Sequence, residues 1–239
     1  MMNLRSAIVV GATGLVGSEL IKQLCECDTY VSVTAIVRHQ LDFAHEKLIV
    51  KVRNFEYLEE KDIDFAHEIY CCLGTTKKKA KTKEAFEQVD FSYPLHIASL
   101  AKKKGIPHFI VITAMGAKAT SLVYYNRVKG MLERDLIELD LPQLSLVRPS
   151  LLKGPRKEFR LGERLGGVVL TIAQPLLIGP LKKYRAIEAS QVATAMICIA
   201  LYEKKQKVAI YPSHILQSLA PPIIEEEEEE IIFNWKERE

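Results

Sequence analysis

The chain has 239 residues and a mass of 27.0 kDa, a length typical of one large α/β domain. Its composition, 48% hydrophobic and 26% charged, is that of a globular protein and excludes intrinsic disorder, collagen and coiled coil as the main organisation. The net charge of +3 conceals two unequal parts, because residues 225–239 carry −6 and the remainder of the chain carries +9.

Short apolar runs alternate along the chain with longer helical patterns. In chain order, we expect strand 7–10, helix 15–25, strands 31–37, 48–52 and 68–73, helix 91–104, strand 108–112, helix 124–139, strand 143–147, helix 188–202 and strand 207–211. Near-continuous apolar strands indicate a sheet that helices cover on both faces. The alternation therefore predicts a Rossmann-type α/β fold, a doubly wound parallel sheet with strand order 3-2-1-4-5-6 and a seventh strand added.

The domain organisation follows from shifts in composition. A single Rossmann domain is expected over 1–224, with a small substrate-side segment at about 150–187 that is rich in Gly, Pro and basic residues. Residues 225–239 form an acidic tail in which six glutamates precede an apolar stretch containing the only Trp. This tail is expected either to extend into solvent or to dock on the body or on a partner.

Targeting and metal-binding signals are weak throughout the sequence. The N-terminal apolar run is too short for a signal peptide, and the longest apolar stretch, about 15 residues, contains two prolines, whereas a membrane-spanning helix needs about 20. Five cysteines without regular spacing argue against a disulfide framework or a metal site. A cytoplasmic protein with reduced thiols, no membrane contact and no metal is expected.

A glycine motif, Gly11-Ala-Thr-Gly14-Leu-Val-Gly17, follows the first strand and opens the first helix. Its glycines permit a tight turn, close approach to a pyrophosphate and close helix–strand packing. The helix N-terminus adds free N–H groups and a positive dipole end. The motif predicts dinucleotide binding by Gly11, Thr13, Gly14, Leu15, Val16 and Gly17.

The end of the second strand indicates which dinucleotide is bound. NAD sites usually place an acidic residue there, but Arg38 and His39 occupy this position and no acid follows before Asp42. An arginine fork suits the 2′-phosphate of NADP, so NADPH is the expected cofactor. Further cofactor contacts are expected at the carboxyl ends of the third and fourth strands, from Asn54, Leu73, Gly74 and Thr75.

The pair Tyr125 and Lys129 forms a Tyr-x-x-x-Lys pattern on a predicted helix, with both side chains on one face. A nearby ammonium makes the phenol a better acid or base near neutrality, and the lysine can also bind the nicotinamide ribose. Thr113, at the end of the fifth strand, is the candidate hydroxyl for polarising a substrate carbonyl. The alternative for Thr113 is a strand-end residue that bonds to backbone.

These motifs together resemble the atypical branch of the short-chain dehydrogenase/reductase superfamily, and in particular the Tat-interactive protein oxidoreductase family. The resemblance covers about residues 5–200 and rests on the glycine motif, Arg38, Cys71-Cys72-Leu73-Gly74-Thr75-Thr76, Val89-Asp90, Thr113-Ala-Met-Gly116-Ala, Tyr125-Asn-Arg-Val-Lys129-Gly130 and Val147-Arg148-Pro149. It implies a Rossmann fold, bound NADPH and a Tyr/Lys active-site pair, in a family also known for protein partnerships. Relatives have Ser-Ser where Thr113-Ala114 stands, and Asp90 stands near an expected active-site Asn.

Three functions remain open at this point. The first is an NADPH-dependent oxidoreductase acting on a small carbonyl compound, with Tyr125, Lys129 and Thr113 at the reacting centre. The second is an NADPH-sensing regulatory module with a protein partner, and the third is a sugar-nucleotide epimerase. The lysine clusters are scattered and lack interleaved aromatic residues, so no nucleic-acid partner is expected. Whether the chain forms a homo-oligomer stays open.

Overall fold

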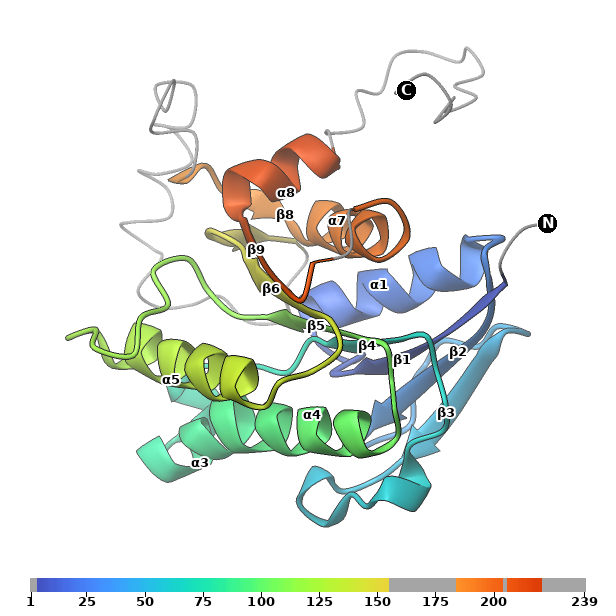
Figure 1. Ribbon diagram of the computed structural model, residues 1–239, viewed down its shortest axis with the longest axis horizontal. Helices are drawn as coiled ribbons and strands as arrows, with labels where there is room; N and C mark the ends of the chain where they lie inside the picture. The colour runs from blue at the N-terminus through green and yellow to red at the C-terminus, as the bar shows by residue number, and fades with distance from the viewer. Residues whose placement is uncertain (1–3, 155–183, 204–205, 221–239) are drawn as a thin grey trace.

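The computed structural model describes residues 4–154, 184–203 and 206–220. Seven strands form one parallel sheet in the order β3-β2-β1-β4-β5-β6-β9 (Figure 1). Their bounds are Arg5–Val10 for β1, Tyr30–Val37 for β2, Leu48–Val52 for β3, Glu68–Cys71 for β4, His108–Ile112 for β5, Leu144–Arg148 for β6 and Val208–Pro212 for β9. The predicted strand order and added seventh strand are confirmed.

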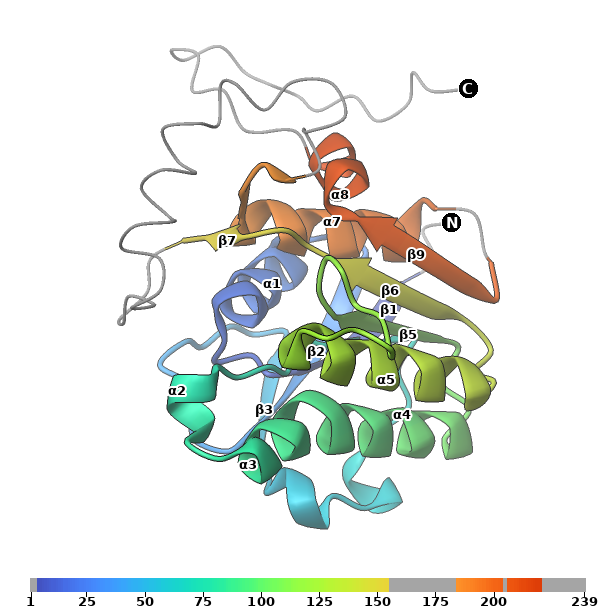
Figure 2. The same ribbon diagram turned by 90° about the vertical axis from the view of Figure 1, so that its left-hand side faces the viewer.

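Helices cover both faces of this sheet. Figure 2 shows α1 (Leu15–Glu26), α7 (Ala189–Leu201) and α8 (Ser213–Leu219) on one side, and α4 (Tyr93–Lys103) and α5 (Tyr124–Glu138) on the other. Two short helices, α2 (Lys77–Ala80) and α3 (Lys83–Glu87), and a π-helical turn, η3 (Gln88–Ser92), precede α4. The short helices α2, α3 and α8 were not predicted, because four to seven residues are too few for helical periodicity to show.

The strands bury alternate side chains in two separate hydrophobic clusters. Val9, Tyr70 and Ile110 belong to the cluster under α1 and α7. Ile8, Ile69 and Phe109 belong to the cluster under α4 and α5. This burial on both faces explains why the strands read as unbroken apolar runs in the sequence.

A second, two-stranded parallel pair joins β7 (Leu152–Lys153) to β8 (Ile187–Glu188). These strands flank the predicted substrate-side segment, most of which (155–183) lies outside the described residues, as does the acidic tail (221–239). Within the described ranges, no helix combines the length and apolar character that a bilayer crossing requires.

A buried charge pair lies at the amino edge of the sheet, opposite the carboxyl ends of the strands. Arg5 of β1 forms an ion pair with Glu68 of β4, whose side chain has no exposed surface. The hydroxyls of Tyr30 and Tyr70 are hydrogen-bonded 2.8 Å apart beside this pair. Burial raises the pKa of Glu68 to about 7, because the attraction of Arg5 offsets the desolvation only in part.

The raised pKa of Glu68 predicts that the free energy of unfolding depends on pH. The unfolded value is near 4.5, so the folded state binds the Glu68 proton more tightly, and the stabilisation it gives is complete below about pH 4.5 and is lost as pH rises through about 7. As pH rises, the free energy of unfolding of wild type should fall by up to about 2–3 kcal/mol because of Glu68, and Glu68→Gln should lack this fall. Urea denaturation between pH 4.5 and 8 measures the difference from wild type, with exposed Glu138→Gln as control. Equal slopes for Glu68→Gln and wild type would contradict the prediction.

Candidate active site

The glycine loop begins where β1 ends, and its backbone lies against the end of β4. Gly11 has a φ of +86°, and a Cβ placed on it would lie 2.7 Å from both the carbonyl carbon and the carbonyl oxygen of Cys72. An L-residue rarely adopts this φ, and the opposing atoms are backbone that cannot rotate away. Only glycine therefore satisfies both conditions at this position.

The first turn of α1 lies directly on this loop. The N–H of Gly14 donates to the Gly11 carbonyl at 2.9 Å. A Cβ on Gly17 would lie only 2.3 Å from the same carbonyl oxygen. No side chain caps the helix, and its first turn contains no acidic residue. Backbone N–H groups at this end are therefore suited to binding an anion, as the sequence predicted.

A cavity of about 80 Å³ opens beside the loop at the carboxyl edge of the sheet. Six predicted cofactor residues line it: Gly11, Thr13, Gly14, Arg38, Leu73 and Gly74. Leu15, Val16, Gly17, Asn54, Thr75 and Lys129, also predicted to contact the cofactor, lie outside its lining. Val16 is packed in the core, so only its backbone is available to a cofactor.

Five residues of the cavity wall were not predicted: Val37, Phe55, Cys72, Val89 and Tyr93. The rings of Phe55 and Tyr93 meet at a centroid distance of 5.8 Å with an interplanar angle of 59°. Phe55 lies in a short 3₁₀ turn that directly follows the predicted Asn54, and Tyr93 begins α4 inside the predicted helix 91–104, where nothing in the sequence marked it as a cavity residue. Together they give this end of the cavity an apolar wall suited to a planar base.

Arg38 lies at the end of β2 with its side chain exposed. Within the part of the chain that the structure describes, it has no ion-pair partner, whereas neighbouring Arg53 is bound to Asp62 at 2.6 Å. Arg38 lies close enough to Tyr93 to influence its phenol: burial and then Glu56 raise the pKa of Tyr93, and Arg38 opposes them. The guanidinium of Arg38, which lines the cavity, is therefore available to bind an anionic group of a ligand.

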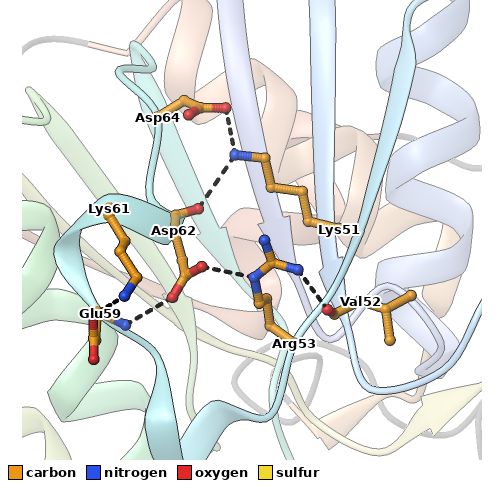
Figure 3. Close-up of polar contacts among 7 residues, drawn as sticks. All are labelled: Lys51, Val52, Arg53, Glu59, Lys61, Asp62 and Asp64. Carbon is orange, nitrogen blue, oxygen red and sulfur yellow. Dashed lines mark hydrogen bonds and ion pairs between the residues drawn. The ribbon is translucent and has the colours of Figure 1, made fainter.

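A network of ion pairs holds the chain between β3 and the cavity wall (Figure 3). Arg53 binds Asp62 at 2.6 Å, and Lys51 binds Asp64 at 2.6 Å. Asp62 also accepts the backbone N–H of Glu59 at 3.0 Å. These contacts fix the segment that carries Asn54 and Phe55. Asn54 uses its side-chain oxygen to cap the next turn at Glu56, so only its amide N–H₂ remains for the predicted adenine contact.

Tyr125 and Lys129 lie one turn apart on α5, as predicted. Lys129 is 2% exposed and its Nζ lies 2.8 Å from Oδ1 of Asp90, which is 1% exposed. Burial alone would lower the pKa of the Lys129 ammonium, but Asp90 and then Tyr125 outweigh burial, so this pKa is raised. Tyr125 is half-buried and its ring contacts Phe86 at a centroid distance of 6.0 Å. The helix thus places a phenol beside a stably charged ammonium.

Of the two roles that the sequence left open for Thr113, its environment fits a strand-end hydroxyl bonded within the protein. Its hydroxyl donates to Oε1 of buried Glu133 at 2.6 Å and lies 3.3 Å from the carbonyl of Val147. Glu133 also receives two hydrogen bonds from Arg148, at 2.9 and 2.5 Å. The single hydroxyl proton of Thr113 is therefore used inside the core and is not free to orient a substrate carbonyl. The next residue, Ala114, has no hydroxyl to offer.

Comparison with known proteins agrees with this geometry. The model of the NAD(P)H-binding family matches residues 11–162. Protein HTATIP2 of Rattus norvegicus is 37% identical over 169 residues, which cover 69% of each chain. Protein FMP52, mitochondrial, of Candida albicans is 32% identical over 231 residues, covering 90% of this chain and 98% of that protein.

Among solved structures, MoeE5 in complex with UDP-glucose and NAD superposes with a TM-score of 0.64 and 12% identity, covering 89% of this chain and 80% of that chain. This likeness is one of fold and supports the Rossmann architecture. The predicted resemblance to Tat-interactive proteins is confirmed by the sequence relatives. By its matched domain, its glycine loop and these relatives, the chain belongs to the NAD(P)H-binding family.

Proposed function

We propose that this protein is an NADPH-dependent oxidoreductase that reduces a small carbonyl compound. The observation that carries the proposal is Tyr125 beside the buried, charged Lys129, whose partner Asp90 also binds the backbone of Thr75, the residue after the cavity-lining Gly74. When bound, a reduced nicotinamide supplies hydride. Tyr125 donates its phenolic proton to the carbonyl oxygen of the substrate.

The charge of Lys129 supports two tasks in this proposal. Its positive charge stabilises negative charge that develops on the Tyr125 oxygen as the proton leaves. Its remaining N–H groups are donors for ribose hydroxyls, which would fix the cofactor relative to the substrate. The glycine loop and the first turn of α1 would hold the pyrophosphate, with Phe55 and Tyr93 beside the adenine.

The preference for NADPH over NADH is assigned to Arg38. Replacing Arg38 by alanine removes a charged hydrogen-bonding group and should weaken NADPH binding by about 10- to 100-fold, while NADH binding stays nearly unchanged. Fluorescence titration of both cofactors measures the two dissociation constants. Arg38→Lys should lose less affinity, and Arg134→Ala, at an exposed distant arginine, should lose none. An equal loss for both cofactors in Arg38→Ala would refute the 2′-phosphate assignment.

One observation favours a second candidate function, an NADPH-sensing binding module with little catalysis. Thr113 donates its hydroxyl to Glu133, and Ala114 has none, so the described end of β5 offers no hydroxyl to a substrate. In this alternative, NADPH binding would alter a surface that a protein partner recognises. The two functions differ in turnover, since only the first consumes NADPH in the presence of a carbonyl compound.

The cellular location is proposed to be the cytosol, on the basis of the cysteine usage. The Candida albicans relative is named as a mitochondrial protein.

A further inference from the structure

Asp90 is a buried acid that the Tyr125–Lys129 pair does not by itself require. Its side chain is 1% exposed, and its Oδ1 lies 2.8 Å from Nζ of Lys129, which is 2% exposed. The two opposite charges meet in the interior, where neither can be solvated. A buried lysine without a counter-ion tends to lose its proton, so a carboxylate at this distance has a direct effect on the charge of Lys129.

The second oxygen of Asp90 contacts a different part of the site. Oδ2 accepts the backbone N–H of Thr75 at 2.7 Å. Oδ1 lies 3.5 Å from the position of a Cβ on Gly74. Gly74 lines the dinucleotide cavity, and Thr75 is the next residue. One carboxylate therefore joins the strand-end segment at the cavity to the lysine on α5.

The backbone around Asp90 is unusual in a way that fits this placement. Asp90 lies in the π-helical turn η3, between α3 and α4. The wider π turn adds a residue to the helical path and changes the direction in which its side chains project, and such turns often occur at functional sites. Here the turn presents a carboxylate to the interior, where a regular amphipathic helix would bury an apolar side chain.

We propose that Asp90 is a positioning residue that keeps Lys129 as an ammonium at the carboxyl edge and couples it to the strand-end segment at Gly74 and Thr75. This inference rests on the proposed function in one respect, namely that Lys129 contacts the bound cofactor. It extends that function by making cofactor affinity at alkaline pH depend on a residue that does not line the cavity.

The other groups that face Lys129 cannot replace Asp90. From β4, Cys71 faces it, and burial raises the pKa of this thiol to about 11, so the thiol is neutral over the relevant pH range. From α5 itself, the Tyr125 phenol faces it. Among the described residues, the Asp90 carboxylate is thus the counter-ion of Lys129, and its removal leaves a buried ammonium uncompensated.

The test is the pH dependence of NADPH affinity in Asp90→Asn, measured by fluorescence titration from pH 7 to 9.5. The 2′-phosphate is fully ionised in this range, since a phosphate monoester loses its second proton near pH 6. Wild type should show no loss of affinity across the range. Asp90→Asn should lose about tenfold or more as Lys129 gives up its proton. The Asn oxygen can still accept the Thr75 N–H, so the change acts mainly on charge.

Matched variants separate this role from a general effect on folding. Glu68→Gln neutralises an equally buried, ion-paired carboxylate at the opposite edge of the sheet and should keep the wild-type profile. Lys129→Met should bind NADPH weakly and without pH dependence in this range. Asp90→Asn should lower Tm by about 6–12 °C, and Asp90→Asn combined with Lys129→Met should restore most of that loss.

A pH profile of Asp90→Asn parallel to that of wild type would overturn the inference. If Asp90→Asn does not fold, the pH profile of wild type is still a test. A loss of NADPH affinity by wild type between pH 7 and 9.5 would contradict an ammonium held by a carboxylate. Failure of wild type to bind NADPH at all would instead overturn the proposed function. Tight NADPH binding by wild type, with the same pH profile in wild type and Asp90→Asn, would contradict only the role of Asp90.

Discussion

Replacing Gly17 by alanine is expected to abolish measurable dinucleotide binding and to lower the free energy of unfolding by about 1–3 kcal/mol. The new Cβ would lie 2.3 Å from the carbonyl oxygen of Gly11 and 3.0 Å from Cα of Ala12. Both atoms are backbone, so α1 must move away from the loop. That movement displaces the N–H groups that would hold the pyrophosphate, and affinity falls with the geometry. Fluorescence titration and urea denaturation measure the two effects.

Gly105→Ala is the matched control for this variant. Gly105 follows α4 at the amino edge of the sheet, and a Cβ there would meet no atom within 4 Å. Its φ of +68° makes alanine mildly strained, so some stability is lost without any contact with the site. NADPH affinity should stay at the wild-type value in this control. Wild-type affinity in Gly17→Ala would show that the loop does not form the phosphate site.

Tyr125→Phe is expected to reduce turnover of NADPH with a carbonyl substrate by about 10²- to 10⁴-fold, the usual contribution of a positioned proton donor. The ring stays and keeps its contact with Phe86, so folding and cofactor affinity should change little. Initial rates of NADPH oxidation, followed by absorbance, measure the effect on kcat.

The neighbouring tyrosine provides the control. Tyr124 donates its hydroxyl proton to Oε1 of Glu87 at 3.0 Å, and the same oxygen lies 3.2 Å from the carbonyl of Lys83, both in exposed contacts. Tyr124→Phe should therefore retain wild-type turnover. Equal rates in wild type and Tyr125→Phe would remove Tyr125 from the mechanism, whatever the cofactor affinity.

Much of the fold was predictable because its signals are local and repeated. The apolar runs at β1, β2 and β5 are longer than turns would permit, and those at β1 and β5 each precede a helical pattern at a spacing typical of a crossover. The glycine loop was equally clear, since Gly11, Gly14 and Gly17 are each close to backbone atoms that leave little room for a side chain. These positions are constrained by sterics that act over a few residues.

The parts of the site that were missed depend on contacts distant in sequence. The sequence left Thr113 open between a substrate contact and a strand-end hydroxyl bonded within the protein, and only the structure shows the hydroxyl directed to Glu133, twenty residues along the chain. The resemblance singled out Asp90 as standing near an active-site Asn, but its ion pair with Lys129 joins a π-helical turn to another helix, and no spacing rule indicates that pair. Phe55 reaches the cavity from a 3₁₀ turn fixed by the contacts of Arg53 and Asp62.

The most direct test of the proposed oxidoreductase follows deuterium from NADPH labelled at C4 of the nicotinamide into a panel of aldehydes and ketones. Mass spectrometry of the products shows whether the label reaches the former carbonyl carbon. The account predicts labelled alcohol from at least one carbonyl compound with wild type, and a loss of about 10²-fold or more with Tyr125→Phe. NADPH that binds tightly yet transfers no label to any member of the panel would contradict it and favour the binding module.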